Sequence, residues 1–165
     1  MGLGHIGGRV AELAKGFDAD VRYWSRNRKS EHEKKGIKFQ DADSLVKEAD
    51  FVSLHFALVP DTEKFLDEKR LQLIKPGAVI VNTAPMELVD INALEKRLGR
   101  GDITFILDHS DEMSEEDLAK LKKFDKCIIY PPIAYLSEEA RIAKQEMFVG
   151  NMESFLKDAP VNTVI

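Results

Sequence analysis

The chain has 165 residues, and 44% of them are hydrophobic, which suffices for the buried core of one compact domain. Its formal net charge of −5 argues against a general affinity for nucleic acid, because phosphate binding draws on clustered Lys and Arg. No apolar stretch reaches the roughly 18 residues needed to span a bilayer, and we expect a cytoplasmic protein without signal peptide or membrane partner. The single cysteine, Cys127, lies in an apolar run and is expected to be a buried thiol without a disulfide.

Helical patterns and short apolar runs alternate along the sequence. Strands are expected at 20–24, 51–55, 78–82, 103–108 and 127–130. Helices are expected at 5–17, 41–49, 91–99 and 114–124, followed by a long closing helix at about 137–158. Since strands rich in Val, Ile and Phe alternate with helices, the expected fold class is α/β, a doubly wound parallel sheet of the Rossmann type. A single domain that ends in the C-terminal helix should cover residues 1–165.

The first residues, MGLGHIGG, place Gly2, Gly4 and Gly7 in the G-x-G-x-x-G spacing at the start of a helix. Such a turn binds a pyrophosphate with the free N–H groups of the helix N-terminus, although the motif alone also fits an ordinary glycine-rich helix start. The turn follows the first strand of a dinucleotide-binding sheet, yet here only Met1 stands before it. We therefore expect a gap at the centre of the sheet that is empty, disordered or filled by another chain.

The segment SRNRK follows the strand at 20–24, where dinucleotide-binding domains carry an acidic residue for the ribose 2′-hydroxyl of NAD. No acid is present in this segment, and Ser25, Arg26, Asn27 and Arg28 offer donors and positive charge that suit a 2′-phosphate. A solvated basic loop is the other interpretation. NADP is therefore the expected cofactor, with NAD as the alternative.

The histidines form no pair with metal-ligand spacing, and no Ser/His/Asp order suggests a nucleophile. His55 lies at the end of an expected strand and His109 follows another, so both could face a crevice, but a structural or cofactor-adjacent role is the simpler interpretation. The acidic run DHSDEMSEED could suggest a cation site. A helix start that is capped by Ser114 explains the run equally well, so no metal site is expected.

Five segments carry a family resemblance: GLGHIGGRVAELAKGF, YWSRNRK, ADFVSLHFALVPDTEKFLDEKRLQLIKPGAVIVNTA, LVDINALEKRL and YPPIAYLSEEA. Taken in this order, they closely resemble the cofactor domain of the D-isomer-specific 2-hydroxyacid dehydrogenases, and SRNRK looks most like that of glyoxylate or hydroxypyruvate reductases. The resemblance implies a homodimer formed through this domain and a nicotinamide cofactor. The residues that it places around this cofactor are Gly4, His5, Ile6 and Gly7 at the pyrophosphate, Ser25, Arg26 and Asn27 at the adenine ribose, and His55, Ala57, Thr62, Thr83, Ala84 and Asp108 along the groove.

The same resemblance implies that the catalytic positions are replaced. The family's carboxylate-binding arginine corresponds to Pro85, its acid/base histidine to Pro132, and the glutamate that orients this histidine to Met113. Ala134 stands at a usual glycine and Ala57 at a usual proline. Hydride transfer to a 2-keto acid needs a proton donor and a cation for the carboxylate, and neither proline nor methionine supplies them.

The leading hypothesis is a catalytically silent, NADP(H)-binding relative of these dehydrogenases. One alternative is an active 2-hydroxyacid or glyoxylate oxidoreductase that is completed by a separate or upstream substrate domain. Another is a purely structural dimerisation module. In the family the closing helix packs onto the substrate domain, so Phe155 and Leu156 would need another apolar partner.

Overall fold

The computed structural model describes residues 1–133 and 135–163, and Ala134 lies outside this described part. The chain divides into two units, Met1–Pro131 and Pro132–Ile165. The prediction of a single domain over residues 1–165 stays a prediction.

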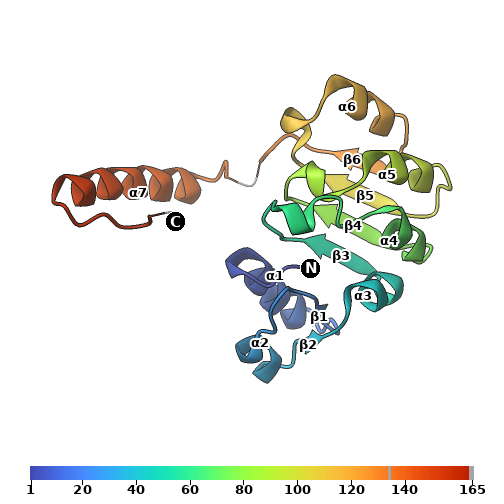
Figure 1. Cartoon of the computed structure of the whole chain (residues 1–165), viewed down its shortest axis with the longest axis horizontal. Helices are drawn as coiled ribbons and strands as arrows, with labels where there is room; N and C mark the ends of the chain where they lie inside the picture. Colours follow the sequence, from blue (N-terminus) through green and yellow to red (C-terminus); the bar gives the residue numbers. More distant parts are fainter. Residues whose placement is uncertain (134, 164–165) are drawn as a thin grey trace. The chain divides into compact units, whose positions relative to one another are not determined.

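The first unit alternates strands and helices, as the sequence predicts (Figure 1). Its strands are β1 (Arg22–Tyr23), β2 (Lys38–Phe39), β3 (Phe51–Leu54), β4 (Val79–Asn82), β5 (Thr104–Leu107) and β6 (Cys127–Ile129). Its helices are α1 (His5–Gly16), α2 (Ser30–Lys34), α3 (Ala42–Glu48), α4 (Glu68–Leu73), α5 (Ile91–Leu98) and α6 (Glu115–Leu121). Three 3₁₀ turns follow strand ends: η1 (Pro60–Thr62), η2 (Met86–Leu88) and η3 (Ser110–Glu112).

The strands form two parallel sheets. One sheet has the order β3-β4-β5-β6, with Val52 opposite Ile80 and Ile80 opposite Phe105, and the other pairs β1 with β2. This confirms the expected α/β fold with a parallel sheet flanked by helices. Within the described residues no strand lies between β1 and β3, so the predicted interruption is present. β2 was not predicted, because its two residues are too few to show a strand pattern.

The two sheets have separate hydrophobic clusters. The larger cluster packs the side chains of β3 to β6 against α3, α4 and α5, and includes Leu54, Ile80, Leu94 and Phe105, each fully buried. The smaller cluster consists of Leu3, Ala11, Tyr23 and Ile37. Cys127 belongs to the larger one and is a free, buried thiol, as expected. Burial raises the pKa of this thiol to about 11.

Polar side chains begin the helices where the sequence predicts them. The carboxylate of Asp41 accepts a hydrogen bond from the Ser44 N–H at the start of α3, at 2.9 Å. The hydroxyl of Ser114 accepts one from the Asp117 N–H at the start of α6, at 3.1 Å. Both caps satisfy backbone donors that the first helical turn leaves free.

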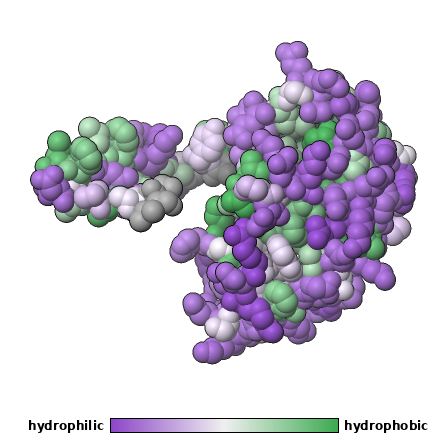
Figure 2. All heavy atoms as spheres, in the orientation of Figure 1, coloured by the Kyte–Doolittle hydropathy of each residue, from purple (hydrophilic) through white to green (hydrophobic). Residues whose placement is uncertain are grey.

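The second unit contains the helix α7 (Glu138–Leu156), which begins after its capping residue Ser137. Its apolar side chains are largely exposed, as the green spheres of this segment show (Figure 2). The most exposed of them are Met147, Phe148, Phe155 and Leu156. In the described part of the chain, none of the helices combines the length and the hydropathy that crossing a membrane requires.

Candidate nucleotide-binding site

The glycine turn at the start of α1 is built by close backbone contacts. Gly2 has a φ of +82°, and a Cβ atom there would lie 2.6 Å from the His55 carbonyl oxygen. A Cβ atom on Gly7 would collide with the Gly2 carbonyl oxygen. Only glycine fits these two positions. A Cβ atom on Gly4, by contrast, would meet nothing within 4 Å.

The open space at Gly4 lies at the N-terminus of α1. No side chain caps this helix, and no acidic residue lies in its first turn. His5 and Ile6 are exposed, and the free N–H groups of this turn, together with the helix dipole, favour a bound anion. A pyrophosphate could therefore approach the backbone at Gly4 closely, as the spacing predicts.

The segment after β1 is basic and lacks a free carboxylate. Ser25 donates a hydrogen bond to the Asn27 carbonyl at 2.6 Å, which closes a tight turn. Arg28 pairs with Glu33 of α2 at 2.6 Å, so that carboxylate is occupied. Arg26 is exposed and has no hydrogen-bond or ion-pair partner among the described residues. Its guanidinium is available for a ligand.

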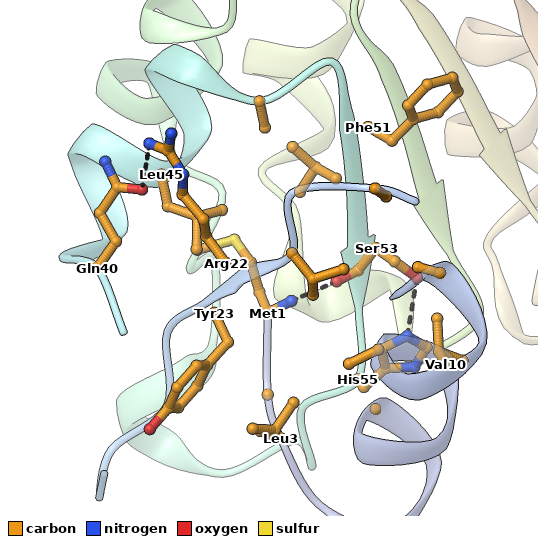
Figure 3. A pocket seen from close by; sticks show the side chains of 18 of the residues that line it. Met1, Leu3, Val10, Arg22, Tyr23, Gln40, Leu45, Phe51, Ser53 and His55 are labelled. Carbon is orange, nitrogen blue, oxygen red and sulfur yellow. Dashed lines mark hydrogen bonds between the residues drawn. The ribbon is translucent and has the colours of Figure 1, made fainter. Parts of the chain in front are cut away.

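His55 follows β3 beside the glycine turn (Figure 3). Its N–H donates to the Met1 carbonyl at 2.8 Å, and its Nε2 atom lies 2.8 Å from the Ser53 hydroxyl. Burial lowers the pKa of the imidazole to about 4, and the nearby Met1 amino group acts in the same direction. His55 is therefore neutral at pH 7 and positions the turn as a hydrogen-bonding group. Its contacts with Met1 and Ser53 could not be predicted from the sequence.

The loop after His55 is fixed by a buried hydroxyl. Thr62 of η1 donates to the Ala57 carbonyl at 2.8 Å and accepts from the Val59 N–H at 2.9 Å. Because these bonds use the Thr62 hydroxyl and its side chain is 7% exposed, its contribution is to shape the loop. Ala57 is exposed on the same loop.

The corner after β4 has an internal amide network. The side chain of Asn82 is fully buried, accepts from the Ala84 N–H at 3.1 Å and donates to the Met86 sulfur at 3.2 Å. Thr83 is exposed between these groups. Met86 is thus part of the core, while Pro85 immediately precedes η2 and offers neither a side-chain donor nor a charge.

Asp108 follows β5 and is the best-defined polar group of the site. It is 8% exposed, and its Oδ1 atom is buried without a hydrogen-bond partner among the described residues. His109 approaches it, with Nε2 at 3.9 Å from Oδ1. A buried carboxylate oxygen without a partner is costly, so this atom is poised to accept a hydrogen bond from a ligand.

Pro85, Met113 and Pro132, which the resemblance places at the family's catalytic positions, carry no proton donor. In the first unit, Met86 and Met113 line one hollow of about 310 Å³, so the structure brings η2 and the segment after η3 together. Met113 also packs against the larger hydrophobic cluster. Pro132 belongs to the second unit, and Ala134 lies outside the described residues.

The fold and these strand ends define a nucleotide-binding α/β domain. The carboxyl ends of β3, β4 and β5 lie at one edge of the sheet, and Met1 and Gly2 connect the glycine turn to the ends of β3 and β1. Ligands of open α/β sheets bind at this edge.

Comparison with known proteins agrees with this class. Residues 1–134 match the family described as "D-isomer specific 2-hydroxyacid dehydrogenase, NAD binding domain". A glyoxylate reductase of Thermococcus litoralis is 39% identical over a match that covers 99% of this chain and 50% of the relative. The NAD-complexed D-isomer specific 2-hydroxyacid dehydrogenase of Lactobacillus delbrueckii ssp. bulgaricus is 31% identical with a TM-score of 0.86, over 99% of this chain and 54% of that one. An acyclic imino acid reductase in complex with NADPH and D-arginine is 33% identical with a TM-score of 0.83. The match covers 99% of this chain and 52% of the reductase.

The chain therefore belongs to the D-isomer specific 2-hydroxyacid dehydrogenase family, and corresponds to its NAD-binding domain. It spans about half the length of the curated relatives that it matches.

Proposed function

We propose that the first unit binds NADP(H) in preference to NAD(H), and that the isolated chain does not catalyse hydride transfer. One combination of features carries the proposal. The backbone at Gly4 is open at the uncapped N-terminus of α1, and the segment after β1 has an exposed Arg26 and no unpaired carboxylate. The first feature suits a pyrophosphate, and the second suits a 2′-phosphate.

The remaining residues fit a nicotinamide dinucleotide. The N–H groups of His5, Ile6 and Gly7 would hold the pyrophosphate, and Ser25, Arg26 and Asn27 would hold the phosphorylated ribose. His55, Ala57, Thr62, Thr83 and Ala84 would border the groove. The buried Oδ1 atom of Asp108 supports a contact with the carboxamide, since an amide N–H would satisfy it. When bound, the cofactor would supply or accept a hydride.

Catalytic silence follows from what the replaced positions lack. Reduction of a 2-keto acid builds negative charge on the carbonyl oxygen, and a proton donor and a cation must be held beside the substrate. Pro85, Met113 and Pro132 provide neither. General acid catalysis alone typically contributes about 10²–10⁴-fold to a rate.

An active oxidoreductase is the second candidate. Two observations favour it: relatives named glyoxylate reductase match nearly the whole chain, and the chain covers about half of them. A substrate domain, on a separate chain or upstream, would then complete the site. NAD stays an alternative cofactor, because similar structures contain NAD or NADPH. The exposed apolar side chains of α7 support a homodimer, since such patches are usually covered.

Isothermal titration calorimetry with NADPH and NADH tests the binding. We expect NADPH to bind more tightly, and Arg26→Ala to weaken NADPH by about tenfold to a hundredfold while leaving NADH nearly unchanged. Arg100→Ala removes an equal charge on the turn after α5 and should leave both affinities unchanged. Equal or tighter binding of NADH by the original chain would contradict the proposed preference.

A second variant separates folding from binding. Gly4→Val adds a side chain where the protein leaves open space, so the melting temperature should stay the same. The side chain would occupy the proposed pyrophosphate position and should abolish NADPH binding. Normal NADPH binding by Gly4→Val would show that the pyrophosphate does not bind at the glycine turn.

Turnover distinguishes the two candidates. NADPH absorbance at 340 nm is followed with glyoxylate, hydroxypyruvate or pyruvate, and an active family member serves as the positive control. We expect no steady consumption by the isolated chain. Turnover that scales with protein concentration and survives repurification would overturn catalytic silence and favour the oxidoreductase.

A further inference from the structure

The loop between β1 and α2 is closed by one buried hydroxyl. Tyr23, the last residue of β1, is 1% exposed, and its hydroxyl accepts a hydrogen bond from the Lys29 N–H at 2.6 Å. Lys29 is the residue that precedes α2. The hydroxyl therefore joins the two ends of the loop, and residues 24–28 lie between them. Inside this loop the bond from Ser25 to the Asn27 carbonyl fixes a second, smaller turn.

Glu33 of α2 completes the closure. Its Oε1 atom accepts hydrogen bonds from the Tyr23 hydroxyl at 2.7 Å and from Arg28 Nε at 3.0 Å, while its Oε2 atom accepts one from Arg28 Nη2 at 2.6 Å. Such a bidentate pair adds geometric specificity as well as energy. The Arg28 guanidinium holds the pKa of Glu33 below its usual range, and the Tyr23 hydroxyl acts in the same direction. One carboxylate thus connects the end of β1 to the end of the loop.

An aromatic ring also holds the Arg28 guanidinium. The Arg28 Cζ atom lies 5.1 Å from the centroid of the Phe39 ring, in cation–π geometry. Phe39 belongs to β2 and packs edge-to-face with Tyr23, with 5.4 Å between the ring centroids. Although the Arg28 side chain is 67% exposed, its guanidinium is therefore engaged by a carboxylate and by an aromatic face.

Arg26 differs from Arg28 in each of these contacts. It is exposed, and among the described residues it has neither a hydrogen-bond acceptor nor an ion-pair partner. The two arginines are close neighbours in the sequence, so residue type does not distinguish them. Glu33 does, because both of its oxygens bind Arg28. The structure thus leaves one arginine of this loop for a ligand.

α2 is itself attached to the helix that carries the glycine turn. His32 packs so closely against Gly8 that a Cβ atom on Gly8 would lie 2.8 Å from the His32 Cε1 atom. Lys35, directly after α2, pairs with Glu12 of α1 at 2.6 Å. Glu33 lies between these two contacts in the sequence. The same pair of helices therefore supports the loop of Arg26 and the turn that is proposed for the pyrophosphate.

We propose that Tyr23 and Glu33 are positioning residues for nucleotide recognition: they close the loop and retain Arg28, so that Arg26 is the arginine that binds the 2′-phosphate. This inference rests on the proposed preference for NADP(H). A loop that is closed before the ligand arrives loses little conformational freedom on binding, so closure strengthens the contact with the phosphate. NADH carries no 2′-phosphate, and its affinity should depend little on closure.

Calorimetry of the full chain with NADPH and NADH measures the role of Glu33. Glu33→Ala removes the acceptor of Tyr23 and the partner of Arg28, and should weaken NADPH about threefold to tenfold while NADH changes by less than about twofold. Glu33→Gln keeps an acceptor for both groups and should retain most of the preference. Glu31→Ala removes an equal charge from an exposed position of the same helix, and should not weaken NADPH.

Two further substitutions identify the arginine that binds the phosphate and the group that closes the loop. Arg28→Ala should weaken NADPH by about threefold or less, against about tenfold to a hundredfold for Arg26→Ala. Tyr23→Phe removes only the hydroxyl and should weaken NADPH as Glu33→Ala does. Because Tyr23 and Glu33 act through one closure, the double variant should bind NADPH no more weakly than the weaker of the two single variants.

Amide hydrogen exchange, followed by NMR without nucleotide, measures the closure directly. The Lys29 amide should exchange about tenfold faster in Tyr23→Phe and in Glu33→Ala than in the original chain, because each substitution weakens the bond that protects it. The amides of β4 should keep their exchange rates, which shows that both variants stay folded.

The outcomes separate this inference from the proposed function. Equal or tighter binding of NADH by the original chain would overturn both. A preference for NADPH that is unchanged in Glu33→Ala and Tyr23→Phe, or a Lys29 amide that exchanges no faster in them, would overturn only the positioning role.

Two other results would also overturn the positioning role alone. Tighter NADPH binding by Glu33→Ala would show that Glu33 competes with the phosphate for Arg28. A loss in Arg28→Ala as large as that in Arg26→Ala would show that both arginines bind the phosphate.

Discussion

The sheet of β3 to β6 and the pair β1–β2 arise from the same alternation of strands and helices, but they differ in how completely they are supported. Each inner strand of the larger sheet has a partner on both sides, and its side chains belong to one large cluster. β1 and β2 pair only with each other in the described chain and rest on four buried side chains. The difference shows that an α/β pattern does not by itself give the same local stability throughout a domain. Local stability depends on how many strands pair with each other and on how many side chains are buried around them.

Substitution of one arginine in each region tests this comparison, and the change in the larger sheet should cause the largest loss of stability. Arg97 of α5 is 1% exposed, pairs with Asp102 and donates to the Leu71 and Ile74 carbonyls. We expect Arg97→Ala to lower the free energy of unfolding by about 3–5 kcal/mol, because it leaves buried acceptors unpaired. Urea unfolding measures this effect.

Arg22→Ala is the matched change in the smaller sheet. Arg22 pairs with Asp20 and Glu48, but all three side chains are well exposed. Exposed pairs contribute little, so the unfolding midpoint should hardly move. If both variants lost similar stability, burial would not be what distinguishes the two regions.

Two isoleucines compare the clusters themselves. Ile80 of β4 is fully buried in the larger cluster, and Ile37 is 1% exposed in the smaller one. Ile80→Ala should cost about 2–5 kcal/mol of global stability and lower the protection of every strand. Ile37→Ala should remove amide protection from β1 and β2 and leave that of β4 and β5 nearly unchanged. Hydrogen exchange followed by NMR measures both, and a uniform loss in Ile37→Ala would mean that the two sheets unfold as one.

Met1 and His55, which lie between the two sheets, should make the free energy of unfolding depend on pH. This is the smallest of the expected effects. Burial lowers the pKa of Met1 from 8.0 to about 5 and that of His55 from 6.5 to about 4. Between pH 8 and 5 the unfolded chain therefore binds protons that the folded chain does not, so stability falls as the pH falls. The expected loss is about 1–3 kcal/mol, and stability should be level above pH 8.

Urea unfolding across this pH range, above the range where carboxylates titrate, measures the slope. Acetylation of the Met1 amino group should remove its contribution to this slope, and His55→Gln should remove the contribution of the imidazole. A slope that survived both changes would place the titrating groups elsewhere in the chain.

Much of the larger sheet could be predicted from the sequence because its signals are local. The apolar runs predicted β3 to β6, and Ser114 caps the start of a helix as expected. β2 was missed, since two residues carry no periodicity, and the expected strand at 20–24 is reduced to Arg22–Tyr23. Short edge strands depend on their neighbours rather than on their own composition.

The candidate site divides in the same way. The spacing of Gly2, Gly4 and Gly7 and the basic SRNRK segment could be identified in the sequence, as could the lack of donors at Pro85, Met113 and Pro132. The partnerless Oδ1 atom of Asp108 and the contact of Ser53 with His55 could not, because they depend on burial and on side chains meeting across the fold. The local sequence does not show which polar atoms become buried and lose their hydration.

The sequence by itself determined the strands β3 to β6, the helices α1, α3, α5, α6 and α7, the glycine turn and the absence of an acid after β1, because these depend on residue type and on spacing along the chain. Only the tertiary structure decided that the strands divide into two sheets, and that Met1 is hydrogen-bonded at the end of β3 while Gly2 is hydrogen-bonded at the end of β1. The physical reason is that hydrogen bonds between strands and the burial of charge depend on distances between residues far apart in sequence.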